Sequence, residues 1–124
     1  MFKDHPIFLE SINFIRSKLG PHNFNKLEKE VLERLIHTSG DFSIKDLLEF
    51  SQNACDIGIK ACKSGAPIIT DTEMAAVAIR TMARNTQGNL VISIRQWLNA
   101  DNNYSSTSSA YGIEKAWLEL SKNN

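Results

Sequence analysis

The sequence has no excess of either charge, few cysteines and no long apolar run. Fourteen Lys and Arg residues balance fourteen Asp and Glu residues, so the charge gives no reason to expect a nucleic acid or an anionic membrane as a partner. The longest apolar segments, such as residues 66–69, are only a few residues long, so the sequence predicts no transmembrane helix. The first ten residues include charges and a histidine where a signal peptide would need an apolar core. We therefore expect a cytoplasmic protein.

Only two cysteines occur, Cys55 and Cys62, in a segment whose composition predicts a helix. Seven residues of helix separate two Cα atoms by about 10 Å, which is too far for a disulfide bond. The spacing also lacks the second ligand pair of a zinc site. We expect both thiols to be reduced and no metal to be bound.

The composition is that of an ordinary globular protein. The chain has 124 residues, of which 42% are hydrophobic and 23% are charged. This length is enough to bury a core and is typical of one domain, here residues 1–124.

Helical periodicity alternates with short apolar runs along the chain. Helices are predicted over residues 6–19, 25–40, 51–65, 71–83 and 109–120, and strands over 66–70 and 89–94. Asn25 and Glu28 have the spacing of a capping box for the second helix, while residues 41–50 fit either a short helix or a strand. The alternation predicts an α/β layered domain.

The stretch RLIHTSGDF, residues 34–42, contains a histidine that chemistry could use. Arg34 and His37 are one helical turn apart on the same face. His37 lies near the predicted C-terminus of the helix, where the macrodipole favours the imidazolium and would raise its pKa. An ordinary helix-terminal histidine has the same local sequence, and taken alone that interpretation is favoured.

Other candidate residues also have structural alternatives. Asp71 follows a predicted strand directly, and ligands bind at the carboxyl ends of strands in open α/β sheets. It could equally cap the next helix, which its local sequence favours. Met74 is predicted to lie in the core. The serine-rich residues 101–109 offer hydroxyl groups but lack the glycines and lysine of a P-loop, so a linker is favoured. Ser108 or Ser109 is expected to cap the helix that follows.

Four segments together resemble a known family. They are HPIFLESINFIRSKLG (5–20), RLIHTSGDF (34–42), FSQNACDIGIKACKSGAPIITDTEM (50–74) and STSSA (106–110). In order and spacing they resemble the precorrin-8X methylmutases, also called precorrin isomerases, over residues 5–112.

The resemblance implies a three-layer α/β/α fold with a short, mostly parallel central sheet, usually in a homodimer without metal or organic cofactor. It also implies an isomerase of cobalamin biosynthesis that acts on a tetrapyrrole. A methyl group moves from C-11 to C-12 of precorrin-8X or cobalt-precorrin-8, which gives hydrogenobyrinate or cobyrinate.

The resemblance also implies roles for particular residues. His37 matches the catalytic histidine, which donates and accepts a proton as the conjugated ring changes tautomer. The positions that it implies for substrate binding are Ser11, Arg34, Thr38, Gly40, Asp71, Met74 and Thr107. An arginine suits a substrate with many carboxylates, because its planar fork binds them bidentately.

The chain departs from the family pattern in two places. Ser108 stands where the resemblance predicts an arginine after Thr107. Family members also continue beyond the helix that matches residues 109–120 into further strands of the sheet, so we expect a shortened methylmutase fold whose open sheet edge something must cover. The alternative function is a non-catalytic corrinoid-binding module, or a remnant that another chain completes.

Overall fold

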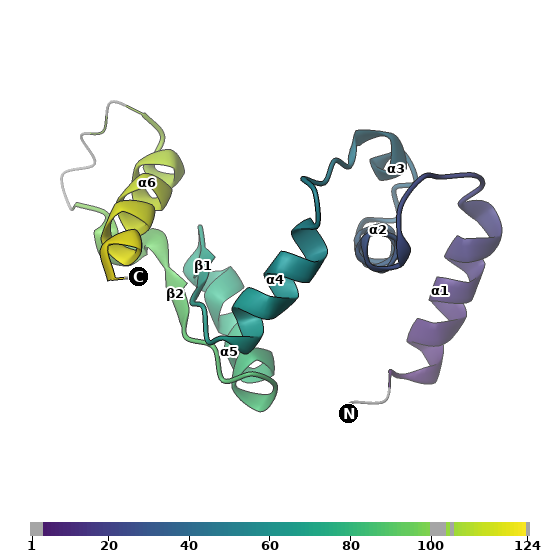
Figure 1. Ribbon diagram of the computed structural model, residues 1–124, viewed down its shortest axis with the longest axis horizontal. Helices are drawn as coiled ribbons and strands as arrows, with labels where there is room; N and C mark the ends of the chain where they lie inside the picture. The colour runs from purple at the N-terminus through teal and green to yellow at the C-terminus, as the bar shows by residue number, and fades with distance from the viewer. Residues whose placement is uncertain (1–3, 100–103, 105, 124) are drawn as a thin grey trace. The chain divides into compact units, whose positions relative to one another are not determined.

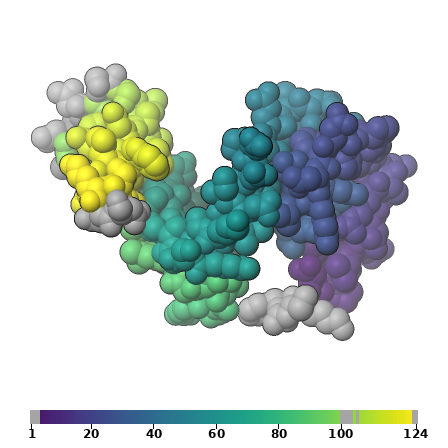
Figure 2. Space-filling view, viewed as in Figure 1, coloured from purple at the N-terminus to yellow at the C-terminus, as the bar shows by residue number. Residues whose placement is uncertain are grey.

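The computed structural model describes residues 4–99, 104 and 106–123 (Figure 1). The chain divides into two compact units, unit 1 (Met1–Gly58) and unit 2 (Ile59–Asn124). Figure 2 shows unit 1 from purple to blue-green and unit 2 from teal to yellow. Each unit has its own elements and its own buried residues.

Unit 1 is helical. Helix α1 (Pro6–Lys18) packs against α2 (Lys26–Ser39), and the short α3 (Ile44–Leu47) contacts α2. The capping box at the start of α2 is confirmed: the Asn25 side chain accepts hydrogen bonds from the backbone of the first turn, and Glu28 accepts one from the Asn25 N–H. Of the two conformations predicted for residues 41–50, the short helix is the one that forms.

Aliphatic side chains from one face of α1 and one face of α2 form the core of unit 1. The buried members are Ile12, Ile15, Leu19, Leu32 and Ile36. Their three- and four-residue spacing is that of an amphipathic helix. This core holds α1 against α2. The polar side chains that lie at the edge of the contact are therefore held near one another.

Helix α4 (Ala54–Lys63) begins in unit 1 and ends in unit 2. It stops two residues before its predicted end at Gly65. Gly65 has a φ of 83°, which lies in the left-handed region that favours glycine. Both cysteines lie on this helix as free thiols, Cys55 half-buried and Cys62 exposed.

Unit 2 contains a β-α-β arrangement. Strand β1 (Ile68–Thr70), helix α5 (Glu73–Asn85) and strand β2 (Val91–Ser93) follow one another, and the two strands pair in parallel with Ile68 opposite Val91. Helix α5 packs on both strands. The predicted α/β class is therefore confirmed in coarse form, as a mostly helical chain whose described part has a two-stranded parallel sheet.

The rest of unit 2 follows β2 directly. The 3₁₀ helix η1 (Ile94–Trp97) continues from the strand, α6 (Ser108–Leu120) packs on η1, and η2 (Ser121–Asn123) follows. The close contact between α6 and η1 depends on Gly112. A Cβ at this position would lie 2.8 Å from both Cβ and Cδ1 of the buried Ile94.

The hydrophobic cluster around the sheet of unit 2 is built mainly from small residues. Ala76, Ala83 and Val91 are buried, with Ile68 and Ile79 packed against them. The buried Asn89 ties the loop before β2 to the end of α4, because its amide donates to the carbonyl oxygens of Cys62 at 2.8 Å and Ala66 at 2.9 Å. The expectation that Met74 lies in the core was wrong: its side chain is 81% exposed on α5.

The expected caps of two helices in unit 2 were also wrong. Thr72, and not Asp71, caps α5 by accepting from the Ala75 N–H at 3.1 Å. Thr107, and not the serines after it, caps α6 by accepting from the Ala110 N–H at 3.2 Å.

Among the described residues, no helix is both long and apolar enough to cross a membrane.

Candidate functional site

The imidazole of His37 lies in the last turn of α2, and its side chain is exposed. Its Nδ1 is 2.7 Å from the hydroxyl oxygen of Ser11 on α1, which is a hydrogen bond between the two helices. Which atom donates depends on the tautomer of the ring. When Nδ1–H donates to the Ser11 hydroxyl, Nε2 of the neutral ring is the nitrogen left to accept a proton from a ligand and to return it.

A phenylalanine links His37 to Arg34. The Phe8 ring on α1 meets the imidazole edge-to-face, with ring centroids 4.9 Å apart and planes at 79°. The guanidinium carbon of Arg34 lies 4.6 Å from the centroid of the same ring, within the range of a cation–π contact. Ser11, Arg34 and His37, which the sequence proposed separately, thus form one cluster around Phe8.

Arg34 also forms an ion pair with Asp4, at 3.7 Å between nitrogen and oxygen. Its side chain is 61% exposed, so this pair contributes at most about 1 kcal/mol and can be exchanged for another carboxylate. A cavity of about 370 Å³, here called the Arg34 cavity, lies beside this pair. Its lining residues are Asp4, Phe8, Leu9, Ile12, Asn13, Arg16, Glu30, Glu33 and Arg34.

A bidentate ion pair in the lining of the Arg34 cavity joins α1 to α2. The Nε and Nη2 atoms of Arg16 each donate to one carboxylate oxygen of Glu33 at 2.8 Å. Glu33 is 2% exposed and Arg16 is 48% exposed. The hydrogen bonds with this carboxylate raise the pKa of the Arg16 guanidinium above its usual value. The pair fixes the spacing of the helices on which Ser11 and His37 lie.

Thr38 and Gly40 have local roles in the structure. The Thr38 hydroxyl donates to the backbone oxygen of Arg34 at 2.9 Å, one turn earlier in α2. Gly40 ends the helix with a φ of 71°, and its N–H donates to the Ile36 carbonyl. Both residues shape the end of α2 beside His37, and each is exposed.

A second pocket lies in unit 2 where β1 and β2 end. This strand-end pocket has a volume of about 630 Å³. It is lined by Asp71, Thr72, Glu73, Ile94, Arg95, Leu98, Asn99, Ser108 and Ser109. Its place matches the sequence argument for Asp71, because the carboxyl ends of both parallel strands lead into it.

Not every predicted residue of unit 2 lines this pocket. Asp71 does, whereas Met74 and Thr107 do not. Met74 is one position beyond Glu73 on α5, and Thr107 caps α6 directly before Ser108. The structure therefore gathers Ser11, Arg34 and His37 in unit 1 and places Asp71 in a separate pocket within unit 2.

Several residues of these sites were not found from the sequence, among them Asp4, Phe8 and Arg95. Asp4 and Phe8 pair with Arg34, and Arg95 lines the strand-end pocket. The position of Phe8, one turn before Ser11 on the same helix face, was a usable signal. Asp4 precedes the predicted helix of residues 6–19, and Arg95 follows the predicted strand of residues 89–94. Neither residue is therefore part of a periodic pattern that could have indicated its role.

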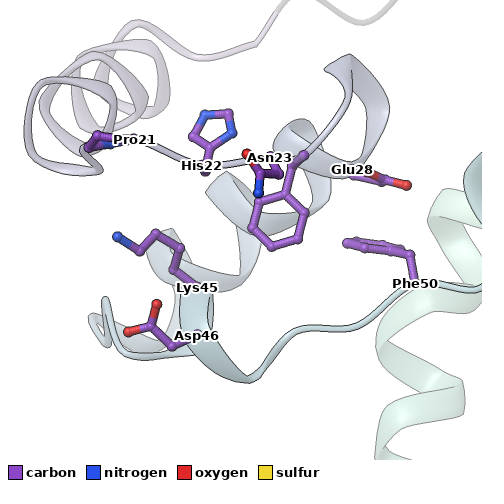
Figure 3. Close-up of a pocket in the computed structure, with 8 residues that line it drawn as sticks. Pro21, His22, Asn23, Glu28, Lys45, Asp46 and Phe50 are labelled. Atoms are coloured by element: carbon purple, nitrogen blue, oxygen red, sulfur yellow. The ribbon is translucent and has the colours of Figure 1, made fainter.

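Unit 1 has another pocket between the α1–α2 loop and α3, shown in Figure 3. Its volume is about 400 Å³, and His22 and Asn23 lie on one side of it with Lys45 and Asp46 on the other. Lys45 donates to the Leu19 backbone oxygen at 3.3 Å and so ties α3 to the end of α1. In the described part of the chain, no cluster of three or more His, Cys, Asp and Glu side chains could hold a metal ion.

Comparison with known proteins identifies the family. The CbiC model, described as precorrin-8X methylmutase, matches residues 6–123. The chain belongs to the precorrin-8X methylmutase family. A cobalt-precorrin-8 methylmutase of Leptospira interrogans is 40% identical over 65 residues, which are 52% of this chain and 30% of that protein.

Two further relatives give the same assignment. The cobalt-precorrin-8 methylmutase of Synechocystis sp. is 30% identical over 100 residues, covering 69% of this chain and 46% of the relative. The crystal structure of the precorrin-8X methylmutase of Thermus thermophilus has a TM-score of 0.76 and 32% identity, covering 91% of this chain and 55% of that one. The chain thus spans less than half the length of the two curated relatives and about half of the solved structure.

Proposed function

We propose that this protein catalyses the methylmutase rearrangement, with His37 as the proton relay. The substrate is precorrin-8X or cobalt-precorrin-8, and its methyl group moves from C-11 to C-12 to give hydrogenobyrinate or cobyrinate. Family membership supports the reaction. The observation that carries the role of His37 is the 2.7 Å contact between its Nδ1 and the Ser11 hydroxyl on an otherwise exposed ring.

The chemistry asks little of the protein beyond binding and proton transfer. Because the methyl group migrates within one molecule, no external nucleophile or acceptor is consumed. The protein must stabilise the tautomer of the macrocycle that leads to the transition state. With Nδ1–H of His37 donating to the Ser11 hydroxyl, the neutral Nε2 takes a proton from the macrocycle, and the resulting imidazolium returns it as the product tautomer forms.

Arg34 has the position and the chemistry to orient the substrate. Its contact with Phe8 places the guanidinium in the same cluster as the imidazole, and its ion pair with Asp4 is exposed and weak. A substrate carboxylate can therefore replace Asp4 as its partner. The Arg34 cavity, at about 370 Å³, has room for a peripheral side chain, while the macrocycle itself lies outside it.

Family membership also supports a homodimer as the functional form, built on a three-layer α/β/α fold with residues 1–124 in one domain. Size-exclusion chromatography with light scattering at several concentrations would measure the assembly. A mass of twice 13.9 kDa is expected, and a monomer at all concentrations would contradict the dimer.

A non-catalytic corrinoid-binding module is the second candidate. The exposure of His37 favours it, because catalysis by proton transfer gains from a site that excludes water and the Arg34 cavity does not enclose the imidazole. This candidate predicts tight binding of the macrocycle without conversion.

Absorbance spectroscopy separates the two candidates. Precorrin-8X is mixed with a small amount of the protein and the spectrum is followed over time. The methylmutase reaction predicts a progressive change that continues far beyond one equivalent of substrate. A spectrum that changes only up to one equivalent, and then stays constant, would support the binding module and refute the catalytic proposal.

A further inference from the structure

We infer that Arg95 makes the strand-end pocket selective for a free carboxylate over the corresponding carboxamide. The inference rests on the proposed function for the identity of the ligand, since it takes the carboxylate to be a side chain of the tetrapyrrole. It concerns a residue and a pocket of unit 2, whereas the cluster around His37 belongs to unit 1.

The pocket has a guanidinium that no other described residue neutralises. Arg95 is exposed in η1, directly after β2, and its side chain forms no ion pair within residues 4–99, 104 and 106–123. Its backbone is fixed, because its N–H donates to the Ser93 hydroxyl at 3.3 Å. The residue is therefore held at the end of a strand while its charged group is available to a ligand.

The two acidic residues of the pocket, Asp71 and Glu73, differ in whether their carboxylates already have a cationic partner. Glu73 is paired with Arg80 on the next turns of α5, at 2.7 Å. Asp71 is the remaining carboxylate of the lining. Arg95 and Asp71 together give the lining no net charge beyond the paired Glu73, so a doubly charged phosphate is less favoured than a singly charged group that contacts Arg95 directly.

The other lining groups add hydrogen-bond donors. Helices α5 and α6 both begin at the pocket, and Ser108 and Ser109 place two exposed hydroxyls there. The caps of these helices use only the Ala75 and Ala110 N–H groups. Glu73, Ser108 and Ser109 line the pocket from the first turns of these helices, where free N–H groups and the positive ends of the helix dipoles favour a carboxylate.

A carboxylate and a carboxamide of the same shape differ in what Arg95 can do with them. The guanidinium fork donates two parallel hydrogen bonds to the two oxygens of a carboxylate, whereas an amide offers it one oxygen and presents competing N–H donors. Loss of a hydrogen bond to a charged group weakens binding by about tenfold or more. The acid form of a ligand is therefore preferred by about that factor.

The test compares binding of hydrogenobyrinate and of its fully amidated derivative, measured by absorbance titration without turnover. Arg95→Gln should weaken the binding of the acid about tenfold or more and leave the affinity for the amide nearly unchanged. The affinity of this variant for the acid should also depend less on salt concentration than that of the parent. Arg95→Lys should keep part of the preference. Arg84→Gln, which removes an exposed arginine of α5 outside this pocket, should keep all of it.

The inference is overturned if Arg95→Gln binds the acid as the parent does, or weakens both ligands equally. It is also overturned, together with the proposed function, if the parent protein binds neither corrinoid. If the protein binds the acid in an Arg95-dependent way but does not convert precorrin-8X, only the catalytic proposal fails.

Discussion

At the scale of single residues, His37 depends on partners from another helix. Its hydrogen bond goes to Ser11 and its aromatic contact to Phe8, and both of these residues are on α1. The sequence could place His37 near a helix C-terminus and Arg34 one turn before it, because both follow from local spacing. It could not place Ser11 against the imidazole, because that contact requires the packing of α1 on α2.

Replacing Ser11 tests whether this hydrogen bond assists the reaction. In Ser11→Ala the imidazole loses the group that fixes its tautomer, and we expect kcat to fall by about fivefold to tenfold, the equivalent of about 1 kcal/mol. The matched control is Ser17→Ala on the same helix, whose hydroxyl donates to the Phe14 carbonyl at 2.7 Å. Equal rates in the two variants would contradict the role of Ser11.

Asp41 is a second residue whose properties come from one neighbour. Its carboxylate accepts from the Ser43 hydroxyl at 2.7 Å and from the Ser43 N–H at 2.8 Å. These bonds hold the pKa of Asp41 below its usual value, with the hydroxyl as the larger cause. Because the folded-state pKa is lowered, the stability they add is present above the unfolded-state pKa and is lost as pH falls through the folded-state pKa.

Ser43→Ala should therefore raise the pKa of Asp41 toward its usual value and reduce the loss of stability on acidification. An NMR titration of the Asp41 carboxyl carbon in parent and variant measures this change directly. An unchanged titration midpoint would show that the hydroxyl does not stabilise the carboxylate.

At the scale of helices and strands, the sequence placed most elements and missed two caps. The start of α2 was predictable because Asn25 and Glu28 form a pattern that few other arrangements share. For α5 the sequence offers two neighbouring cap residues, Asp71 and Thr72, and only the backbone conformation selects between them. Thr72 has the extended φ and ψ of −121° and 151° that a cap requires.

The buried face of α5 was equally difficult to predict. The residues that contact the strands are Ala76, Ile79 and Ala83, whose three- and four-residue spacing defines one stripe. Met74 is apolar and falls outside that stripe. Alanine side chains are small and contribute little hydrophobicity to a sequence pattern, so the pattern favours the larger Met74 as a core residue.

Gly112 offers a test of the contact between α6 and η1. Gly112→Ala places a methyl group 2.8 Å from Ile94, and we expect the free energy of unfolding to fall by about 1–3 kcal/mol. Gly58→Ala is the control, since this position lies on α4 with no atom within 4 Å of the added Cβ. There the better helix propensity of alanine should leave stability unchanged or raise it by about 0.5–1 kcal/mol. Urea unfolding of both variants measures the difference, and equal stabilities would contradict the contact.

At the scale of the whole molecule, the hydrophobic clusters of the two units differ in the size of their buried side chains. Five large aliphatic side chains are buried together in unit 1, whereas the cluster around the sheet in unit 2 buries two alanines and a valine. The composition could indicate a globular α/β chain. It could not show this division, because burial depends on which helix faces meet.

This difference predicts unequal local stability. Strands β1 and β2 are three residues long each, and a two-stranded sheet is marginal without substantial packing. Amide hydrogen exchange should therefore be faster in β1 and β2 than in the centres of α1 and α2. Hydrogen exchange with mass spectrometry measures both regions in one experiment. Slower exchange in the strands than in α2 would contradict this account of where the stability resides.

The most direct test of the central claim is the turnover of precorrin-8X by His37→Ala beside the parent protein, with binding of hydrogenobyrinate measured for both. Loss of a positioned general acid–base group predicts a fall in kcat of about 100-fold or more. Because the ring lies on the surface and is not part of the core, the variant should still fold and bind hydrogenobyrinate. Equal turnover by the variant and the parent would contradict the role of His37 as the proton relay.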